Sequence, residues 1–584
     1  MSLYRVRSNE LVNAYLYKAL ADAYASYRAT ANNNNPVKIS IPQDAITKRI
    51  LMAQTVEDYS ILNPIVELEK SRAITPKGHS GMNLDDAYTQ DKRSYDSTML
   101  GVLAMSTSPD ANCGIVRQLT MEPNILGPRG YIDVKNDKLD ELSDANLFSP
   151  AELLSPLGVS RHDSIRTAMA TKQSKHIIPI EKSSPVLISN GAEQVIHYHL
   201  GNDFSVVAKH DGEVIEINED TGVMIVEYRD PKGIPQEAKN GMMSISNTRH
   251  QAIDISPRVV KNGAGGFYLS NQLTTKYKVG QKFKKNDILA ADDKFFSESK
   301  LHGNRFNIGS LQKVASMGSY STYEDSTFIT KKLSQDMASD IVMSKPVVLG
   351  KNANVDYIVK VGDQIKVGEE LIRFETSFED DSLNKFLSSV GDELKEEIIS
   401  MGKTPIKSKY SGEIVDIKIY STVELDELSP SLRKLVQGYY DRINKKRKVL
   451  DKYDKSKDVH KMGILLNEPT KKIETKDGKV KGNEVGEGVL IEFFIKYRDV
   501  MGVGDKITFF TALKSIIGEV IPEGYEPYSE SRPNEEISSV IAPGAILARM
   551  TPSILLTMFG NKVLVETKRK LEEIYTGKPW EPKK

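Results

Sequence analysis

Two distant parts of this chain repeat the same pair of short motifs. Residues 279–289 (VGQKFKKNDIL) are echoed by 361–371 (VGDQIKVGEEL), and residues 211–217 (DGEVIEI) are echoed by 411–417 (SGEIVDI). Each first motif has the glycine and the alternation of a tight hairpin, and each second motif has the apolar alternation of a strand. Because the pair of motifs occurs twice, we expect two copies of a small barrel-sandwich hybrid module.

The other periodic segments predict an α+β, multidomain chain that is rich in strands and carries helical insertions. Short strands are indicated over 204–208, 212–217, 222–228 and 277–290, and a longer buried strand over 491–497. Helical spacing of apolar residues, with Ser429 and Pro430 as one start signal, predicts helices over 1–30, 44–58, 382–400, 430–458 and 552–575.

Composition limits the class of protein. A chain of 584 residues with 39% hydrophobic content can bury several cores, and length alone predicts roughly three or four domains. The 79 Lys+Arg balance the 79 Asp+Glu, which excludes a generally cationic surface but allows local basic patches. A single cysteine, Cys113, excludes an internal disulfide and fits a reducing compartment. No apolar run is long enough to predict a membrane span.

One cluster of cations suggests a phosphate-binding site. Gly504-Asp505-Lys506 follows the predicted buried strand, Lys514 lies eight residues further on, and Arg549 follows within Ala548-Arg549-Met550. A Gly-Asp-Lys turn aims one ammonium group out of a rigid edge, and a second lysine at this spacing can converge on the same anion. Since such turns also occur on ordinary surfaces, a solvated turn remains the alternative.

Other polar residues support weaker hypotheses. His197 and His199 would face one side of a predicted strand and could ligate a metal, but no Cys or acidic third ligand is near. The adjacent carboxylates Glu324 and Asp325 would face opposite sides of a strand and make a poor metal cage alone. The sequence contains no phosphate-binding G-x-x-x-x-G-K-[ST] motif and no Asp-x-Asp-x-Asp motif.

Six or seven segments, in one order between about residues 60 and 560, resemble the β subunit of multisubunit RNA polymerase. They are Asn63-Pro64-Ile65-Val66-Glu67-Leu68 with Lys70 and Arg72, residues 106–115, Arg161-His162-Asp163 with Arg166 and Lys175, Gly191-Ala192-Glu193, Tyr323-Glu324-Asp325 with 328–333, and the segment with Lys506, Lys514 and Arg549. The order of these segments is far more specific than any single one.

The resemblance implies a role for each candidate residue. It places Lys506 and Lys514 at the RNA 3′ end, Arg549, Arg166 and Lys175 beside the incoming nucleotide, and Lys70 and Arg72 against nucleic acid. Glu324 and Asp325 would lie near a second, nucleotide-borne Mg²⁺, while the catalytic Mg²⁺ triad would be held by a β′-like partner chain. It also implies a double-psi β-barrel half built from residues 310–345 and 490–550, in a nucleotidyltransferase that binds DNA and the RNA–DNA hybrid.

Departures from the family refine this interpretation. The family's Gly-Arg-His-Gly-Asn-Lys run is here 509–514 (FFTALK), which keeps the lysine and changes the loop, and Lys175 replaces an arginine. The chain begins near the fork segment and stops soon after Arg549. It therefore resembles the C-terminal fragment of a split β subunit of giant-bacteriophage type. We then expect an N-terminal β-like fragment, β′-like fragments, a promoter-specificity factor, DNA, RNA and NTPs as partners, and the cytoplasm of the infected bacterial host as location.

On this basis the chain divides into five predicted regions. They are a helical entry (1–60), a fork- and rifampicin-pocket-like region (61–190), a barrel-sandwich module with the start of the double-psi barrel (191–345), a flap-like insertion (346–489), and the end of the barrel with a C-terminal helix (490–584). In the insertion, Phe386, Leu387 and Val390 lie on the apolar stripe of the predicted helix 382–400 and resemble the tip that docks the promoter-specificity factor. The ten Lys/Arg between 431 and 458 predict a solvated helix face or a nucleic-acid contact.

Two other functions remain open. The duplicated hairpins are also typical of biotinyl and lipoyl carrier modules, although the exposed lysine beside Met or Asp-Ala that those modules modify is not found between the paired motifs. A polymerase-derived scaffold without catalytic activity would carry the same segments. Co-purification with a chain that bears an Asp-rich magnesium motif distinguishes the enzyme from the scaffold.

Overall fold

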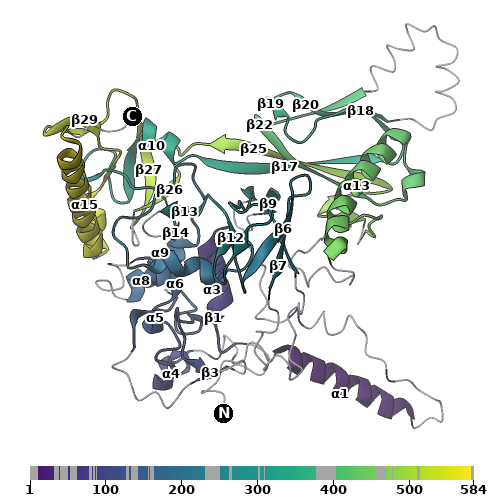
Figure 1. Ribbon diagram of the computed structural model, residues 1–584, viewed down its shortest axis with the longest axis horizontal. Coiled ribbons are helices and arrows are strands. Elements are labelled where there is room, and N and C mark those ends of the chain that lie inside the picture. Colours follow the sequence, from purple (N-terminus) through teal and green to yellow (C-terminus); the bar gives the residue numbers. More distant parts are fainter. Residues whose placement is uncertain are drawn as a thin grey trace, which may run out of the picture.

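The computed structural model of the protein describes most of the chain. The described residues are 11–31, 39, 50, 52, 62–77, 82, 86, 88–108, 110–126, 130–132, 142–155, 157, 164–229, 250–261, 266–299, 303–307, 309–376, 403–453, 468–475, 478–509 and 513–579. Over these ranges the fold is mixed α+β and rich in strands, as predicted (Figure 1). No helix in these ranges is long and apolar enough to cross a membrane.

A ladder of two long strands crosses the molecule. β17 (Ser339–Gly350) and β25 (Gly488–Asp499) pair antiparallel without a register shift, from Ser339↔Asp499 to Gly350↔Gly488. The first eight residues of β25 are buried, because this strand is covered on both faces. In Figure 1 the ladder runs from the strands β26 and β27 at the left to the strands β18 and β20 at the right.

The duplication predicted from the sequence is confirmed in the strand pairing. In the first copy Phe283 pairs with Gly212, and in the second copy Ile365 pairs with Gly412. Both copies also have a register shift two residues after this glycine. The first copy contains β5 (Ser205–Val207), β6 (Gly212–Asn218), β7 (Val223–Tyr228), β8 (His250–Asp254), β11 (Lys282–Phe283) and β12 (Ile288–Ala291); the second contains β18 (Ala353–Ile358), β19 (Gln364–Ile365), β20 (Glu370–Thr376), β21 (Lys403–Lys407) and β22 (Gly412–Ser421).

The two paired glycines are required by close backbone approach. A Cβ on Gly212 would lie 2.4 Å from the carbonyl oxygen of Glu227, and one on Gly412 would lie 2.0 Å from that of Lys496. Both distances are far shorter than a van der Waals contact, so a side chain at either position would force the neighbouring strand away. The glycine of the Gly-Glu motif is therefore required at the same close backbone approach in each copy.

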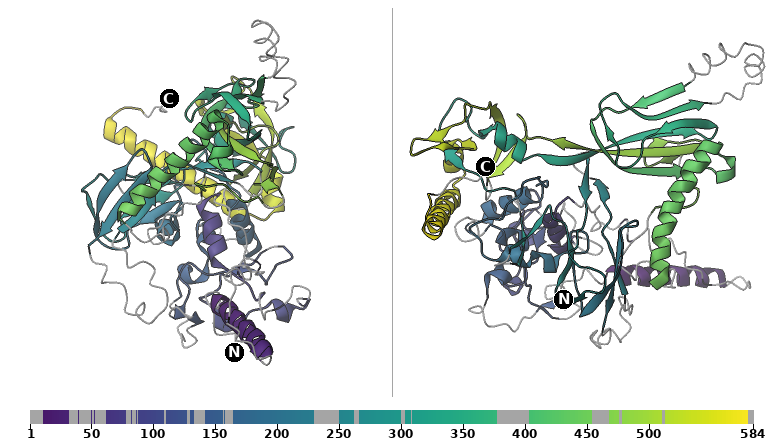
Figure 2. Two further views of the ribbon diagram at one scale, coloured as in Figure 1. Left: turned by 90° about the vertical axis from the view of Figure 1, so that its right-hand side faces the viewer. Right: turned by 45° about the horizontal axis from the view of Figure 1, so that its top comes forward.

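One helix joins the two copies. The N-terminal half of α13 (Pro430–Tyr453) packs into the second copy, and near its C-terminus Leu450 is buried against β7 and β8 of the first copy. Lys446 pairs with Asp254 at 2.8 Å, and Lys452 pairs with Glu216 at 2.7 Å. Figure 2 shows this helix reaching from one copy to the other. Part of its charge run thus makes ion pairs within the chain.

A five-stranded sheet forms a half-barrel from two parts of the chain that are distant in sequence. Its order is β15-β30-β16-β27-β26, in which β15/β30 and β16/β27 are parallel. The strands come from the two predicted regions, 310–345 and 490–550, and two helices follow the last strand. The bounds are β15 (Val314–Ser316), β16 (Ser326–Thr330), β26 (Lys506–Phe509), β27 (Leu513–Ile521), β30 (Ser539–Ile541), α14 (Pro543–Ala548) and α15 (Pro552–Thr576).

The region before the first copy contains several short helices. They are α3 (Pro64–Arg72), α4 (Gln90–Arg93), α5 (Asp144–Leu147), α6 (Pro150–Leu153), α8 (Ser164–Ser174) and α9 (Ala192–Val195), with α1 (Leu11–Ala31) preceding them. The prediction of a strand around His197 and His199 is wrong, because both residues lie in a short 3₁₀ helix, η5 (Ile196–His199). The predicted helices 44–58 and 382–400 fall almost wholly outside the described residues.

Most of the smaller strands form separate two-stranded sheets. The remaining strands are β1 (Ala73–Ile74), β2 (Arg117–Gln118), β3 (Ile125–Leu126), β4 (Tyr131–Ile132), β9 (Arg258–Lys261), β10 (Tyr268–Asn271), β13 (Phe296–Ser299), β14 (Gly303–Phe306), β23 (Lys479–Val480), β24 (Asn483–Glu484), β28 (Tyr528–Ser529) and β29 (Arg532–Glu536). The short helices η3 (Ser97–Met99), α10 (Lys331–Asp336) and η8 (Leu425–Glu427) lie in the connections. β10 and β9 extend the sheet of the long ladder beyond β17.

The close approach at Gly412 gives a direct test of the fold. Gly412→Ala is expected to destabilise the protein by about 1–3 kcal/mol, because the new methyl group overlaps the Lys496 carbonyl. Gly438→Ala is the matched control, since Gly438 is exposed in α13 with open space around its Cα; it should stabilise by about 0.5–1 kcal/mol. Thermal unfolding of both variants measures this. Equal melting temperatures would contradict the close approach of β22 and β25 at Gly412.

Candidate nucleic-acid and phosphate site

The Gly-Asp-Lys turn has a fixed backbone. Gly504 adopts a φ of +93°, and its N–H donates to the carbonyl of Ile517 at 2.8 Å. The Asp505 carboxylate accepts the N–H of Gly502 at 2.7 Å, which closes the turn from the other side. Lys506 is therefore the first residue of β26, held in register against β27.

The two lysines lie on one face of the half-barrel sheet. Lys506 pairs with Ile516, and Thr508 pairs with Lys514, so the lysines are diagonal neighbours on adjacent antiparallel strands. Both are exposed, whereas the intervening Ile507 and Ser515 are buried on the opposite face. Diagonal neighbours lie about 7–8 Å apart, close enough for two ammonium groups to contact one phosphate chain. Among the described residues, no carboxylate forms an ion pair with either of them.

Arg549 is held beside the same strands. It follows α14, and its guanidinium donates a charge-assisted hydrogen bond to the carboxylate of Asp325. The carbonyl of Asp325 accepts the hydroxyl of Ser515 and the N–H of Ile516, the latter at 3.0 Å. Because Ser515 and Ile516 directly follow Lys514 on β27, the third cation is anchored to the strand that carries the second.

A buried asparagine fixes the fork-like segment. Asn63, which is only 2% exposed, caps α3 by accepting the N–H groups of Ile65 and Val66 at 3.0 and 3.1 Å. Its amide nitrogen lies within hydrogen-bond distance of the carbonyls of Ser174, Lys175 and Ile177, at 3.2, 3.1 and 2.7 Å. One side chain thus locks the start of α3 to the end of α8.

This lock places further lysines beside the half-barrel. Lys175 pairs with Glu69 at 2.8 Å, and burial together with the charge of Lys175 lowers the pKa of Lys70. Burial, followed by the charges of Lys175, Lys172 and Lys514 among others, lowers the pKa of His176. The pKa of His176 is therefore lowered by lysines from the end of α8, from the turn after it and from β27.

Lys172 and His176 are site residues that the sequence analysis did not name. Lys172 lies in the last turn of α8, three residues before Lys175, which follows the helix. Its ammonium group is 3.5 Å from the carboxylate of Asp110, within the predicted loop 106–115. The i, i+3 spacing of Lys172 and Lys175 is a signal that points to this shared face. The site therefore draws on four predicted segments: Asn63 to Lys70, the 106–115 loop, α8, and the half-barrel.

The remaining predicted residues differ in placement. The guanidinium of Arg72 donates to the carbonyls of Thr120 and Met121 at 2.7 and 3.1 Å and contacts Nδ1 of His199 at 3.0 Å, so it binds neighbouring segments together. Burial lowers the pKa of Arg72. Arg166 belongs to α8, but its side chain lies outside the described part of the structure. Phe386, Leu387 and Val390 are also outside the described residues.

The carboxylates and histidines form no metal cage. In the described ranges there is no group of three or more His, Cys, Asp or Glu placed to hold a metal ion. Asp325 is paired with Arg549, and Glu324 stands exposed in the turn before β16 with a φ of +51°. His199 contacts Arg72. His197 is buried, and this burial, with a smaller effect of the neighbouring His199, lowers the pKa of His197 to about 4. Its environment is that of a core histidine.

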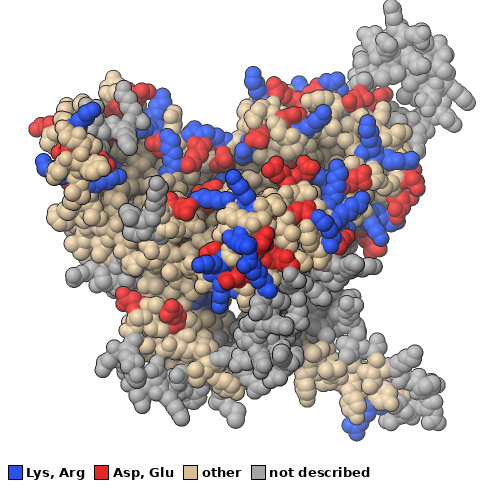
Figure 3. All heavy atoms as spheres, viewed as in Figure 1, with Lys and Arg blue, Asp and Glu red and all other residues tan. Residues whose placement is uncertain are grey.

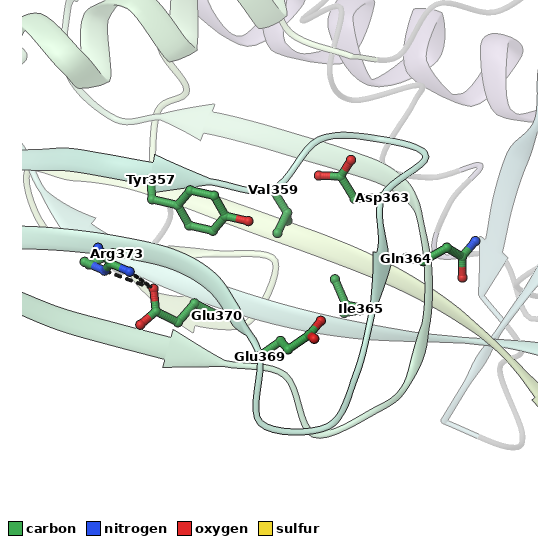
Figure 4. Close-up of a pocket in the computed structure, with 8 residues that line it drawn as sticks. All are labelled: Tyr357, Val359, Asp363, Gln364, Ile365, Glu369, Glu370 and Arg373. Carbon is green, nitrogen blue, oxygen red and sulfur yellow. Dashed lines mark hydrogen bonds and ion pairs between the residues drawn. The ribbon is translucent and has the colours of Figure 1, made fainter.

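A separate pocket of about 430 Å³ opens on the second copy (Figure 4). Its polar lining includes Asp363, Glu369 and Glu370, and the last of these pairs with Arg373. The Asp363 and Glu369 carboxylates accept N–H groups of their own turns, at 2.7 and 2.8 Å. An acidic rim of this kind repels phosphate, so this pocket does not compete with the lysine-rich site as the candidate phosphate site.

Comparisons with known proteins point to one class of protein. A family model described as bacteriophage RNA polymerase matches residues 1–85. The chain is 21% identical over 399 residues to the DNA-directed RNA polymerase subunit beta of Kosmotoga olearia, covering 64% of this chain and 32% of that protein. It is 22% identical over 355 residues to the corresponding subunit of Desulfosudis oleivorans, covering 55% and 23%. The matched part spans about a quarter to a third of these relatives. Together the matches support an RNA polymerase β-like protein.

Proposed function

We propose that this chain forms the substrate-facing part of a β-like subunit in a DNA-directed RNA polymerase, a nucleotidyltransferase. The observation that carries the proposal is the convergence of Lys506, Lys514 and Arg549 on one edge of the half-barrel. Lys172 and Lys175, at the end of α8, and Lys514 all lower the pKa of His176, which supports a cationic surface that extends beyond the sheet. Such an arrangement suits a polyanion that follows the strands, as an RNA end and a triphosphate do.

The proposed mechanism is positioning and electrostatic stabilisation. Lys506 and Lys514 hold phosphates of the RNA 3′ end, while Arg549, Arg166 and Lys175 steady the triphosphate for in-line attack by the 3′ hydroxyl. Asp325 keeps the Arg549 side chain extended beside β27 before the nucleotide binds. Arg72 positions the fork-like segment from which Lys70 contacts the nucleic acid.

A divalent Mg²⁺ would neutralise charge on the reacting phosphates in such an enzyme. The described residues hold no cluster that fits this ion on its own, and Asp325 already pairs with Arg549. We therefore assign the Mg²⁺ ligands mainly to a β′-like partner chain. Glu324 and Asp325 are proposed to lie near the nucleotide-borne ion.

The finer architecture belongs to the same proposal. The half-barrel would complete a double-psi β-barrel, and the chain would be the C-terminal fragment of a split β subunit of giant-bacteriophage type, acting in the cytoplasm of the infected host. An N-terminal β-like fragment and β′-like fragments would complete the complex around DNA, RNA and NTPs. The order of the matched segments, from Asn63 to Arg549, supports this arrangement.

Loss of the two sheet lysines tests the catalytic role. In the complex purified with its partners, Lys506→Ala combined with Lys514→Ala should slow RNA elongation at least roughly a hundredfold, because phosphate-stabilising cations are removed. The control is Lys360→Ala combined with Lys366→Ala, which removes two exposed lysines from the second copy. If the chain is part of an active enzyme, the purified complex should also contain a partner with an Asp-rich magnesium motif. An unchanged elongation rate in the Lys506/Lys514 variant would contradict the proposal.

The insertion carries a second, narrower proposal. The predicted apolar stripe with Phe386, Leu387 and Val390 would dock the promoter-specificity factor. Replacing Phe386 and Leu387 by Ser should weaken promoter-dependent initiation while transcription from a preformed bubble stays unchanged. Equal loss in both assays would argue against docking at this segment.

A further inference from the structure

The two copies of the duplicated module differ sharply in charge at the same hairpin. Residues 276–287 of the first copy contain five lysines and one carboxylate. The corresponding residues 358–369 of the second copy contain two lysines and two carboxylates. Because the strand pairing of the two hairpins is equivalent, the fold itself does not require this excess of lysine.

The pleat of the hairpin turns its rings inward and its lysines outward. Phe283 is 4% exposed and packs against Tyr277, with ring centroids 6.1 Å apart, in the core of the first copy. The flanking Lys282 and Lys284 are exposed, as are Lys278 and Lys285. Figure 3 shows Lys and Arg side chains, with Asp and Glu side chains among them, near the centre of the viewed face.

The carboxylates near the hairpin have other hydrogen-bond or ion-pair partners than the side chains of these four lysines. Glu298 pairs with Lys276, and Glu213, opposite Lys282 in the strand pairing, lies 3.8 Å from Arg229. Asp211 and Asp287 accept backbone N–H groups of the hairpin, at 2.8 Å each. Within the described ranges, Lys278, Lys282, Lys284 and Lys285 form no ion pair.

We propose that these four lysines bind the phosphate backbone of duplex DNA. A duplex carries one charge per about 1.7 Å of its axis, which gives exposed lysines a dense and regular row of phosphates to contact. Single-strand binding surfaces present exposed aromatic rings on which bases stack, whereas the two rings of this hairpin, Tyr277 and Phe283, are turned into the core. With no such ring outside, the contact is electrostatic and independent of base sequence.

This contact is separate from the proposed catalytic site. It lies on the first copy of the duplicated module, and its test measures binding without RNA synthesis. The result of this binding test therefore does not depend on whether the Lys506 and Lys514 substitutions slow RNA elongation. In the complex it would hold DNA at a second point away from the reacting nucleotide.

The test compares equal charge losses in the two copies. Lys282→Gln combined with Lys285→Gln removes two lysines from the first hairpin, and Lys360→Gln combined with Lys366→Gln removes two from the second. Fluorescence anisotropy with a labelled 20-base-pair duplex, between 50 and 200 mM salt, gives the slope of log K against log [salt] for each full-length protein. The first variant should lower the magnitude of this slope by about 1.8, and the second should leave it unchanged. Both should keep the wild-type melting temperature.

Three outcomes would overturn the proposal. An equal slope change in both variants would mean that only total charge matters. Tighter binding of the same sequence as a single strand, lost on substitution at Lys282 and Lys285, would assign the surface to single-stranded nucleic acid instead. Preferential binding of a labelled poly-glutamate peptide, lost in the same variant, would assign it to an acidic protein segment.

Discussion

The β17–β25 ladder is the constraint on which the rest of the structure depends. Twelve consecutive residue pairs hold two chain segments, about 150 residues apart in sequence, in one register. At one end the strands lead into the half-barrel through α10 and the Gly-Asp-Lys turn, and at the other end they carry the second copy of the duplicated module. A slip by one residue would turn every buried side chain of β25 to the opposite face, so the register is strongly specified.

The candidate site follows from this scaffold through a few backbone contacts. The Asp325 carbonyl ties the start of β16 to β27, and its carboxylate holds Arg549. Asn63 ties α3 to the end of α8 and so brings Lys175 to the same region. Cations from separate segments converge because uncharged backbone groups, rather than the cations, determine their positions. Among the described residues Lys506 and Lys514 thus remain available for a ligand, at the cost of mutual repulsion that a polyanion would relieve.

Much of this could be predicted from the sequence where the signal is local. The repeated Gly-Glu motif predicted the duplication, and its glycine marks a backbone approach that admits no side chain. The Gly504-Asp505-Lys506 turn predicted a rigid edge. Contacts between distant segments could not be predicted. Asn63 resembles an ordinary helix cap in the sequence, and its contacts with residues 174–177 depend on tertiary packing. The α13 charges were also ambiguous, because Lys446 and Lys452 find Asp254 and Glu216 about 200 residues away. His197 was misplaced because apolar spacing does not distinguish a short 3₁₀ helix from a strand.

The central claim, that the half-barrel lysines face the RNA 3′ end, is tested most directly by photocrosslinking. RNA with a photoreactive 3′-terminal nucleotide, bound in the assembled polymerase complex, would be crosslinked and the modified peptides identified by mass spectrometry. The account predicts crosslinks in the strands around Lys506 and Lys514 and at the end of α8, near Lys172 and His176. Crosslinks from this chain confined to the second copy of the duplicated module, with none in the half-barrel, would contradict it.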